Sequence, residues 1–157
     1  MPEAQIDRFF MKLKLGYMTR EQELSVISRP STSKIVEELE QVVSLEEIEQ
    51  LKSMIPQISM SDEVAGYLMD IVEHTRSSGH FVLGVSTRGA IALYKASQVT
   101  AALAGRDYVL PEDVRYVAPY VLCHRVTFNG PARTGDIEET FSRLLAEVPA
   151  PLENIRQ

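Results

Sequence analysis

The sequence has little of what marks disulfide-linked, metal-binding or membrane-spanning proteins. It contains one cysteine, Cys123, in 157 residues, so no disulfide can form within the chain. Its three histidines, at positions 74, 80 and 124, lack the spacing of a zinc site. No run of about 18 apolar residues occurs, and the first residues include acids where a signal peptide has basic residues before an apolar stretch. We therefore expect no metal site, signal peptide or membrane insertion, and we expect a reducing, cytoplasmic location.

Positive charge is also scarce. The chain has 16 basic and 22 acidic residues, a net charge of −6, so it lacks the basic balance of proteins that bind nucleic acid or anionic membranes. This argues against a DNA-binding or histone-like helical domain. With 45% hydrophobic and 24% charged residues, the composition is that of a folded domain with one sizeable core.

One segment has the two-residue period of a strand. Between residues 9 and 15, apolar side chains alternate with Lys12 and Lys14, and Gly16 ends the pattern. No second convincing strand is found, and a lone strand has no ladder to pair with. We therefore expect its partner strands to lie outside this chain, which would make the chain a fragment of a longer protein.

From Thr19 onward the pattern predicts helices. Capping boxes at residues 19–22 and 44–47 start helices that end near Ser28 and at Pro56. Residues 28–43 lack a strong period and predict a long, partly ordered connection.

Four more helices follow along the chain. Ser61 and Ser86 are caps for helices that run to about 77 and to just before Gly105, and Pro111 begins another helix. After a polar loop at 127–133, a last helix ends before Pro149. The predicted buried stripes are residues 45, 48, 51 and 55; 64, 68, 71 and 72; 92, 96, 99 and 103; 114, 117, 118 and 121; and 137, 141, 144 and 145.

Two arginines have unusual surroundings. Arg8 lies at the start of the predicted strand, between an acidic neighbour and a hydrophobic run. Arg88 lies in a turn of small residues, GVSTRG, in the first turn of a predicted helix. Small residues allow a ligand or another chain to approach, and the planar guanidinium suits phosphate. Both could instead be surface arginines that are solvated or paired with a carboxylate.

Four segments carry a more specific pattern: 2–9 (PEAQIDRF), 84–89 (GVSTRG), 105–114 (GRDYVLPEDV) and 122–125 (LCHR). In this order and spacing they resemble the C-terminal part of MoxR-type AAA+ ATPases, over nearly the whole chain. The resemblance implies a mainly α fold: an AAA+ C-terminal helical lid bundle preceded by one residual core strand. Residues 1–16 would be a remnant of the α/β core, and 17–157 would be the helical lid domain.

The resemblance also implies site residues and partners. Arg8 would be the arginine finger, acting in trans on the ATP of the adjacent subunit, and Arg88 would be the sensor 2 arginine that contacts the nucleotide of its own subunit. The whole protein would use ATP and Mg²⁺, and it would assemble into a homo-oligomeric ring, with six subunits expected. It would remodel or mature client proteins, in some cases together with von Willebrand factor A domains. Positioned guanidinium groups suit this chemistry because phosphoryl transfer spreads negative charge over the γ-phosphate oxygens.

One departure from the family pattern is decisive for this chain taken alone. It contains no Gly-x-x-x-x-Gly-Lys-Ser/Thr loop and no hydrophobic strand ending in paired acids, the Walker A and Walker B elements. We therefore expect the parent protein to be an ATP hydrolase and this chain alone to be inactive, with no cofactor bound. The alternative is a non-enzymatic helical protein-interaction module whose capped helices merely resemble a lid.

Overall fold

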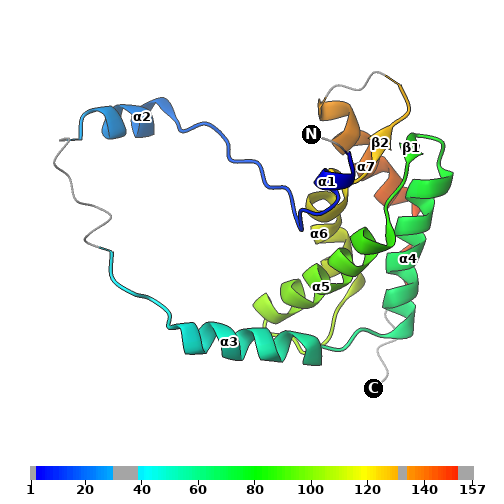
Figure 1. Ribbon diagram of the computed structural model, residues 1–157, viewed down its shortest axis with the longest axis horizontal. Helices are drawn as coiled ribbons and strands as arrows, with labels where there is room; N and C mark the ends of the chain where they lie inside the picture. Colours follow the sequence, from blue (N-terminus) through cyan, green and yellow to red (C-terminus); the bar gives the residue numbers. More distant parts are fainter. Residues whose placement is uncertain (1–2, 30–38, 131–133, 152–157) are drawn as a thin grey trace.

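The computed structural model describes residues 3–29, 39–130 and 134–151. Four helices form its body: α4 (Asp62–Ser77), α5 (Thr87–Leu103), α6 (Pro111–Leu122) and α7 (Thr134–Glu147). They surround one core, and α5 and α6 form its most extensive helix pair (Figure 1). The largest fully buried side chains include Tyr67, Ile71, Leu93, Leu122 and Phe141. The predicted mainly helical lid bundle is confirmed.

The predicted caps begin these helices. Ser61 accepts a hydrogen bond from the Val64 amide at 3.3 Å, and Ser86 accepts one from the Gly89 amide at 3.2 Å. α6 has Leu110 at its N-cap position, which offers no acceptor. The Asp113 carboxylate compensates by accepting a hydrogen bond from the Leu110 amide at 2.8 Å. Helix starts are therefore encoded by local polar side chains, as the sequence predicted.

The predicted strand over residues 9–15 is not formed. After the short helix α1 (Glu3–Ile6), residues 11–19 have no regular secondary structure. Among the described residues, their one backbone hydrogen bond to the bundle is to a helix: the Lys12 amide donates to the Tyr120 carbonyl of α6 at 2.9 Å. No described strand lies beside the segment to complete a ladder. Alternating side chains alone do not hold a strand.

A two-stranded ribbon occurs where no strand was expected. β1 (Phe81–Leu83) pairs antiparallel with β2 (Thr127–Phe128), with Phe81 opposite Phe128 and an irregular register beyond that pair. The two phenyl rings meet edge to face at 5.8 Å. Part of the expected loop at 127–133 is therefore strand, and residues 131–133 lie outside the described part. Strands of two and three residues are too short to show a period.

Two further helices lie outside the four-helix body: α2 (Arg20–Ile27) stands apart from it, whereas α3 (Leu45–Met54) leads into a turn that contacts α5 (Figure 1). Both helices begin at the two predicted capping boxes, and the 3₁₀ turn η1 (Ile55–Gln57) follows α3. Neither α2 nor α3 has a buried residue. The connection expected at 28–43 lies mostly outside the described residues, and positions 39–43 have no helix or strand.

The buried stripe predicted at residues 45, 48, 51 and 55 is wrong, because none of these residues is buried, and the stripe predicted in α5 is only partly correct. In α3, Leu45 is 77% exposed and Leu51 is 58% exposed, because none of the described elements covers that face. In α5, Ala92 and Ala96 are buried as expected, but Leu103, the last residue of the helix, is 85% exposed. No described helix is both long and apolar enough to cross a membrane.

Candidate functional site

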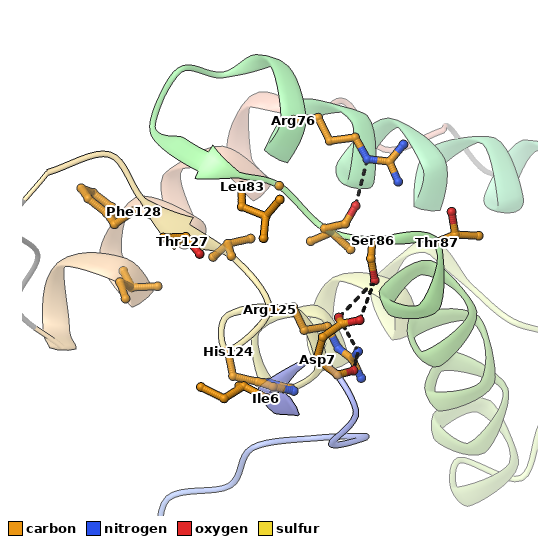
Figure 2. Close-up of a pocket in the computed structure, with 14 residues that line it drawn as sticks. Ile6, Asp7, Arg76, Leu83, Ser86, Thr87, His124, Arg125, Thr127 and Phe128 are labelled. Carbon is orange, nitrogen blue, oxygen red and sulfur yellow. Dashed lines mark hydrogen bonds and ion pairs between the residues drawn. The ribbon is translucent and has the colours of Figure 1, made fainter. Parts of the chain in front are cut away.

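The structure brings the surroundings of the two candidate arginines together. Arg8 follows α1, and its neighbour Asp7 contacts the start of α5. There the Ser86 hydroxyl donates to the Asp7 carboxylate, at 3.1 and 3.0 Å from its two oxygens. Ser86 is the N-cap of α5, and Arg88 is two residues further along. The two predicted site residues are thus linked through one hydrogen-bonded pair, Asp7 and Ser86 (Figure 2).

Arg125, just after α6, organises this contact. Its side chain is 1% exposed. Its Nε donates to the Val121 carbonyl at 2.8 Å. One terminal nitrogen, Nη1, donates to the Asp7 carboxylate at 2.9 Å and also to the Asp7 carbonyl. The other, Nη2, donates to the Phe9 carbonyl at 2.6 Å and to the Phe10 carbonyl at 3.2 Å. These five contacts match the five N–H groups of a guanidinium. The backbone on both sides of Arg8 is therefore held by one buried side chain.

Arg125 lies in one of the motif segments, but the sequence alone indicated no function for it. A signal was present, because positions 114, 118, 121 and 125 continue the helical spacing of the buried face of α6. An arginine on such a stripe must be paired, since burying an unpaired charge is costly. Its partner, Asp7, is 118 residues away in the sequence and could not be identified without the fold.

Two glycines of the GVSTRG segment are explained by close packing. A Cβ on Gly84 would lie 2.8 Å from the Cα and 2.9 Å from the backbone nitrogen of Arg76 in α4. A Cβ on Gly89 would lie 2.6 Å from a methyl group of Val85 and 3.0 Å from the Cδ of Arg125. The small residues therefore bring the start of α5 close to α4 and to Arg125.

A cavity of about 930 Å³ adjoins the site. It lies between α1, the β ribbon, the first turn of α5 and the end of α6 (Figure 2). Asp7, Arg76, Ser86 and Arg125 contribute polar groups to its wall, and Ile6, Leu83 and Phe128 are among its apolar residues. The Nε of Arg76 donates to the Val85 carbonyl at 2.9 Å, which fixes the chain just before Ser86.

Arg8 and Arg88 differ from the buried arginine beside them. Both are exposed, and neither guanidinium makes a hydrogen bond or an ion pair with the rest of the described chain. A free guanidinium can bind phosphate oxygens from outside the chain. The described residues include no cluster of three or more potential metal ligands, so within them no residue set is placed to hold Mg²⁺.

The adjacent Cys123 and His124 do not form a nucleophile and base. Burial raises the pKa of Cys123 to about 12, so its thiol stays protonated at neutral pH. Burial also lowers the pKa of His124. The His124 Nε2 lies 3.1 Å from the Phe9 carbonyl, which requires Nε2 to carry the proton, and its buried Nδ1 has no hydrogen-bond partner in the described structure. His124 is thus another contact to the backbone next to Arg8.

Comparisons with known proteins agree with this architecture. Residues 73–146 match the family described as the AAA lid domain. The uncharacterized protein YeaC of Bacillus subtilis is 38% identical over 155 residues, covering 98% of this chain and 48% of YeaC. The chaperone MoxR1 of Mycobacterium tuberculosis is 29% identical over 165 residues, covering 98% of this chain and 43% of MoxR1.

A solved structure gives the same result. The crystal structure of a presumed ATPase from Cytophaga hutchinsonii superposes with a TM-score of 0.77 at 32% identity, covering 91% of this chain and 48% of that one. The chain thus spans about half the length of the relatives it matches. Together, the helical bundle, the lid match and these relatives identify an AAA lid domain in this chain and agree with the C-terminal region of a MoxR-type AAA+ ATPase.

Proposed function

We propose that this chain is the lid portion of an ATP hydrolase that couples ATP binding and hydrolysis to remodelling or maturation of client proteins. The observation that carries the proposal is the docking of the Arg8 segment onto the start of α5. Arg125 and Ser86 hold Asp7 there, while the flanking Arg8 and Arg88 stay exposed. Two guanidinium groups without partners in the described chain, on linked elements, suit contacts to phosphates.

The two arginines have different tasks in this proposal. Arg88, in the first turn of α5, is the sensor 2 residue and contacts the γ-phosphate of the nucleotide in its own subunit. Arg8 is the arginine finger and contacts the ATP of the adjacent subunit. A finger supplied from a neighbour makes hydrolysis depend on assembly. Residues 1–16 then belong to the end of the α/β core, and 17–157 to the lid.

The remaining machinery is assigned to residues outside this chain. The sequence contains no phosphate-binding loop, so we expect these 157 residues alone to bind no ATP or Mg²⁺ stably and to hydrolyse none. The whole protein would form a ring, with six subunits expected, in the cytoplasm. Its clients, with or without von Willebrand factor A domains, would be moved by changes in the angle of the lid.

The test is nucleotide binding and turnover by the full-length protein. We expect Arg8→Ala to lower kcat by about a thousandfold or more while ATP binding persists, since a finger acts on the transition state. Arg88→Ala should weaken both binding and turnover. Arg115→Ala, an exposed arginine of α6 outside the site, is the control and should match wild type. Wild-type turnover in both site variants would contradict the proposal and favour a non-enzymatic interaction module.

A further inference from the structure

We propose that Arg125, Asp7 and Ser86 form a mechanical link through which the position of α5 sets the position of Arg8. Arg125 is then a positioning residue for the finger, although it contacts no nucleotide itself. The inference rests on the proposed function, because it assumes that Arg88 and Arg8 act on two different ATP molecules. Its consequence is that nucleotide bound in one subunit adjusts the finger offered to the next.

The first step is that Arg125 fixes the turn that carries Arg8. It donates to the carbonyl of Asp7 on one side and to the carbonyls of Phe9 and Phe10 on the other. The turn also has internal bonds, from the Arg8 amide to the Gln5 carbonyl at 3.2 Å and from the Phe9 amide to the Ile6 carbonyl at 3.1 Å. The backbone at Arg8 therefore moves with Arg125.

The second step is that the same turn is tied to α5 at two points. The Ser86 hydroxyl accepts from the Gly89 amide as the helix cap and donates to the Asp7 carboxylate. Gly89, one residue after Arg88, lies directly against the Arg125 side chain, because a Cβ there would come within 3.0 Å of the Arg125 Cδ. A shift of the first turn of α5 therefore acts on both Asp7 and Arg125.

The third step concerns burial. The Arg125 side chain is 1% exposed and that of Asp7 is 25% exposed, with 2.9 Å between their charged atoms. A pair shielded from water keeps a strong attraction and a fixed geometry, whereas exposed pairs are weak and mobile. The link is thus stiff enough to transmit a displacement. Distance alone would not establish coupling, so the test must measure it.

The test uses the full-length protein with changes that cut the link while leaving Arg8 and Arg88 in place. Ser86→Gly removes the hydroxyl but keeps a residue accepted at helix N-caps. Asp7→Asn removes the charge that faces Arg125. Ser86→Thr restores a hydroxyl and a cap. The readouts are kcat, KM for ATP and the Hill coefficient for ATP.

We expect Ser86→Gly and Asp7→Asn to lower kcat about fivefold or more, as is usual for coupling between sites, with a Hill coefficient close to 1 and little change in KM. Ser86→Thr should recover both kcat and the Hill coefficient. In a double-mutant cycle, Asp7→Asn should lower kcat less in the Arg88→Ala background than in wild type. Without Arg88, the position of α5 no longer responds to the nucleotide, so the contact of Asp7 has nothing to transmit.

A matched control separates linkage from loss of stability. Asp113→Asn weakens the other buried arginine–carboxylate pair, between Arg106 and Asp113, at the far end of α6. This variant should have a lower melting temperature than wild type, but its Hill coefficient for ATP should be unchanged. If Asp7→Asn and Ser86→Gly keep the wild-type kcat and Hill coefficient while Arg8→Ala and Arg88→Ala still lower turnover, the linkage is wrong and the proposed function stands. If all four variants match wild type, the proposed function fails as well.

Discussion

Two charged side chains, Asp113 and Arg125, are buried in the described part of the chain, and each has an opposite charge close by. The Asp113 carboxylate lies 2.6 Å from Arg106, and the Arg125 guanidinium lies 2.9 Å from Asp7. Burying an unpaired charge is costly, so Arg106 and Asp7 are needed for Asp113 and Arg125 to remain buried. The two pairs differ in what they hold. The pair of Asp113 and Arg106 fixes the start of α6, whereas the pair of Arg125 and Asp7 fixes the turn that carries Arg8.

The pair at the start of α6 gives the first prediction. Asp113→Ala should lower the free energy of unfolding by about 3 kcal/mol, because it leaves Arg106 without its ion pair and the Leu110 amide without its acceptor. Asp107→Ala, at an exposed acidic residue nearby, should stay within about 0.5 kcal/mol of wild type. Urea denaturation measures both values. Equal losses in the free energy of unfolding would show that the ion pair of Asp113 does not stabilise the fold.

Gly84 gives a prediction of the opposite kind, in which an added atom does the damage. Gly84→Ala should destabilise the protein by about 1–3 kcal/mol, because its Cβ would press on the Arg76 backbone 2.8 Å away. At Gly66, within α4, an added Cβ would meet nothing within 4 Å, so Gly66→Ala should stabilise by up to about 1 kcal/mol. Thermal unfolding of the two variants should shift in opposite directions. A stable Gly84→Ala variant would contradict the close approach of Gly84 to α4.

His124 predicts how stability depends on pH. Burial, the largest cause, lowers its folded pKa below the usual 6.5, so below that pH the unfolded chain binds a proton that the folded chain resists. The contribution is fully present above pH 6.5 and is lost as the pH falls through the folded pKa. The free energy of unfolding should therefore drop more steeply from pH 7.5 to 5 in wild type than in His124→Gln. Parallel pH profiles would contradict this assignment.

At the scale of elements, helix starts were predictable and strands were not. Ser44, Ser61 and Ser86 act as caps at the predicted positions, because capping depends on residues within one turn of each other. The strand expected at 9–15 fails because pairing needs a partner that no local pattern supplies. The ribbon of β1 and β2 was missed because it joins segments more than 40 residues apart and is held by its phenyl contact.

The helices outside the bundle should contribute little to its stability. Leu24 in α2 is 54% exposed, and no residue of that helix is buried, whereas Leu93 in α5 is fully buried. Leu24→Ala should change the free energy of unfolding by less than about 0.5 kcal/mol. Leu93→Ala should lower it by about 3 kcal/mol through lost burial and a cavity. Chemical denaturation distinguishes the two, and a large loss in Leu24→Ala would mean that α2 packs on the bundle in solution.

At the scale of the whole molecule, sequence motifs predict the exposed arginines of the candidate site but did not indicate its buried contacts. Arg8 and Arg88 stand in short segments whose composition can be recognised without a fold. The contacts of Arg125 with Asp7, Phe9 and Phe10 join residues more than 110 positions apart, so they appear only after folding. The candidate site residues can therefore be recognised from short segments, whereas their relative placement depends on the folded core.

The central claim is that Arg8 of one subunit completes the ATP site of the next, while Arg88 acts within its own. Mixing full-length Arg8→Ala with full-length Arg88→Ala tests this most directly, since each should be nearly inactive alone. In randomly mixed rings half the subunits keep Arg88, and half of these have a neighbour that keeps Arg8, so turnover should recover to about a quarter of wild type. A mixture no more active than its two components would contradict the account.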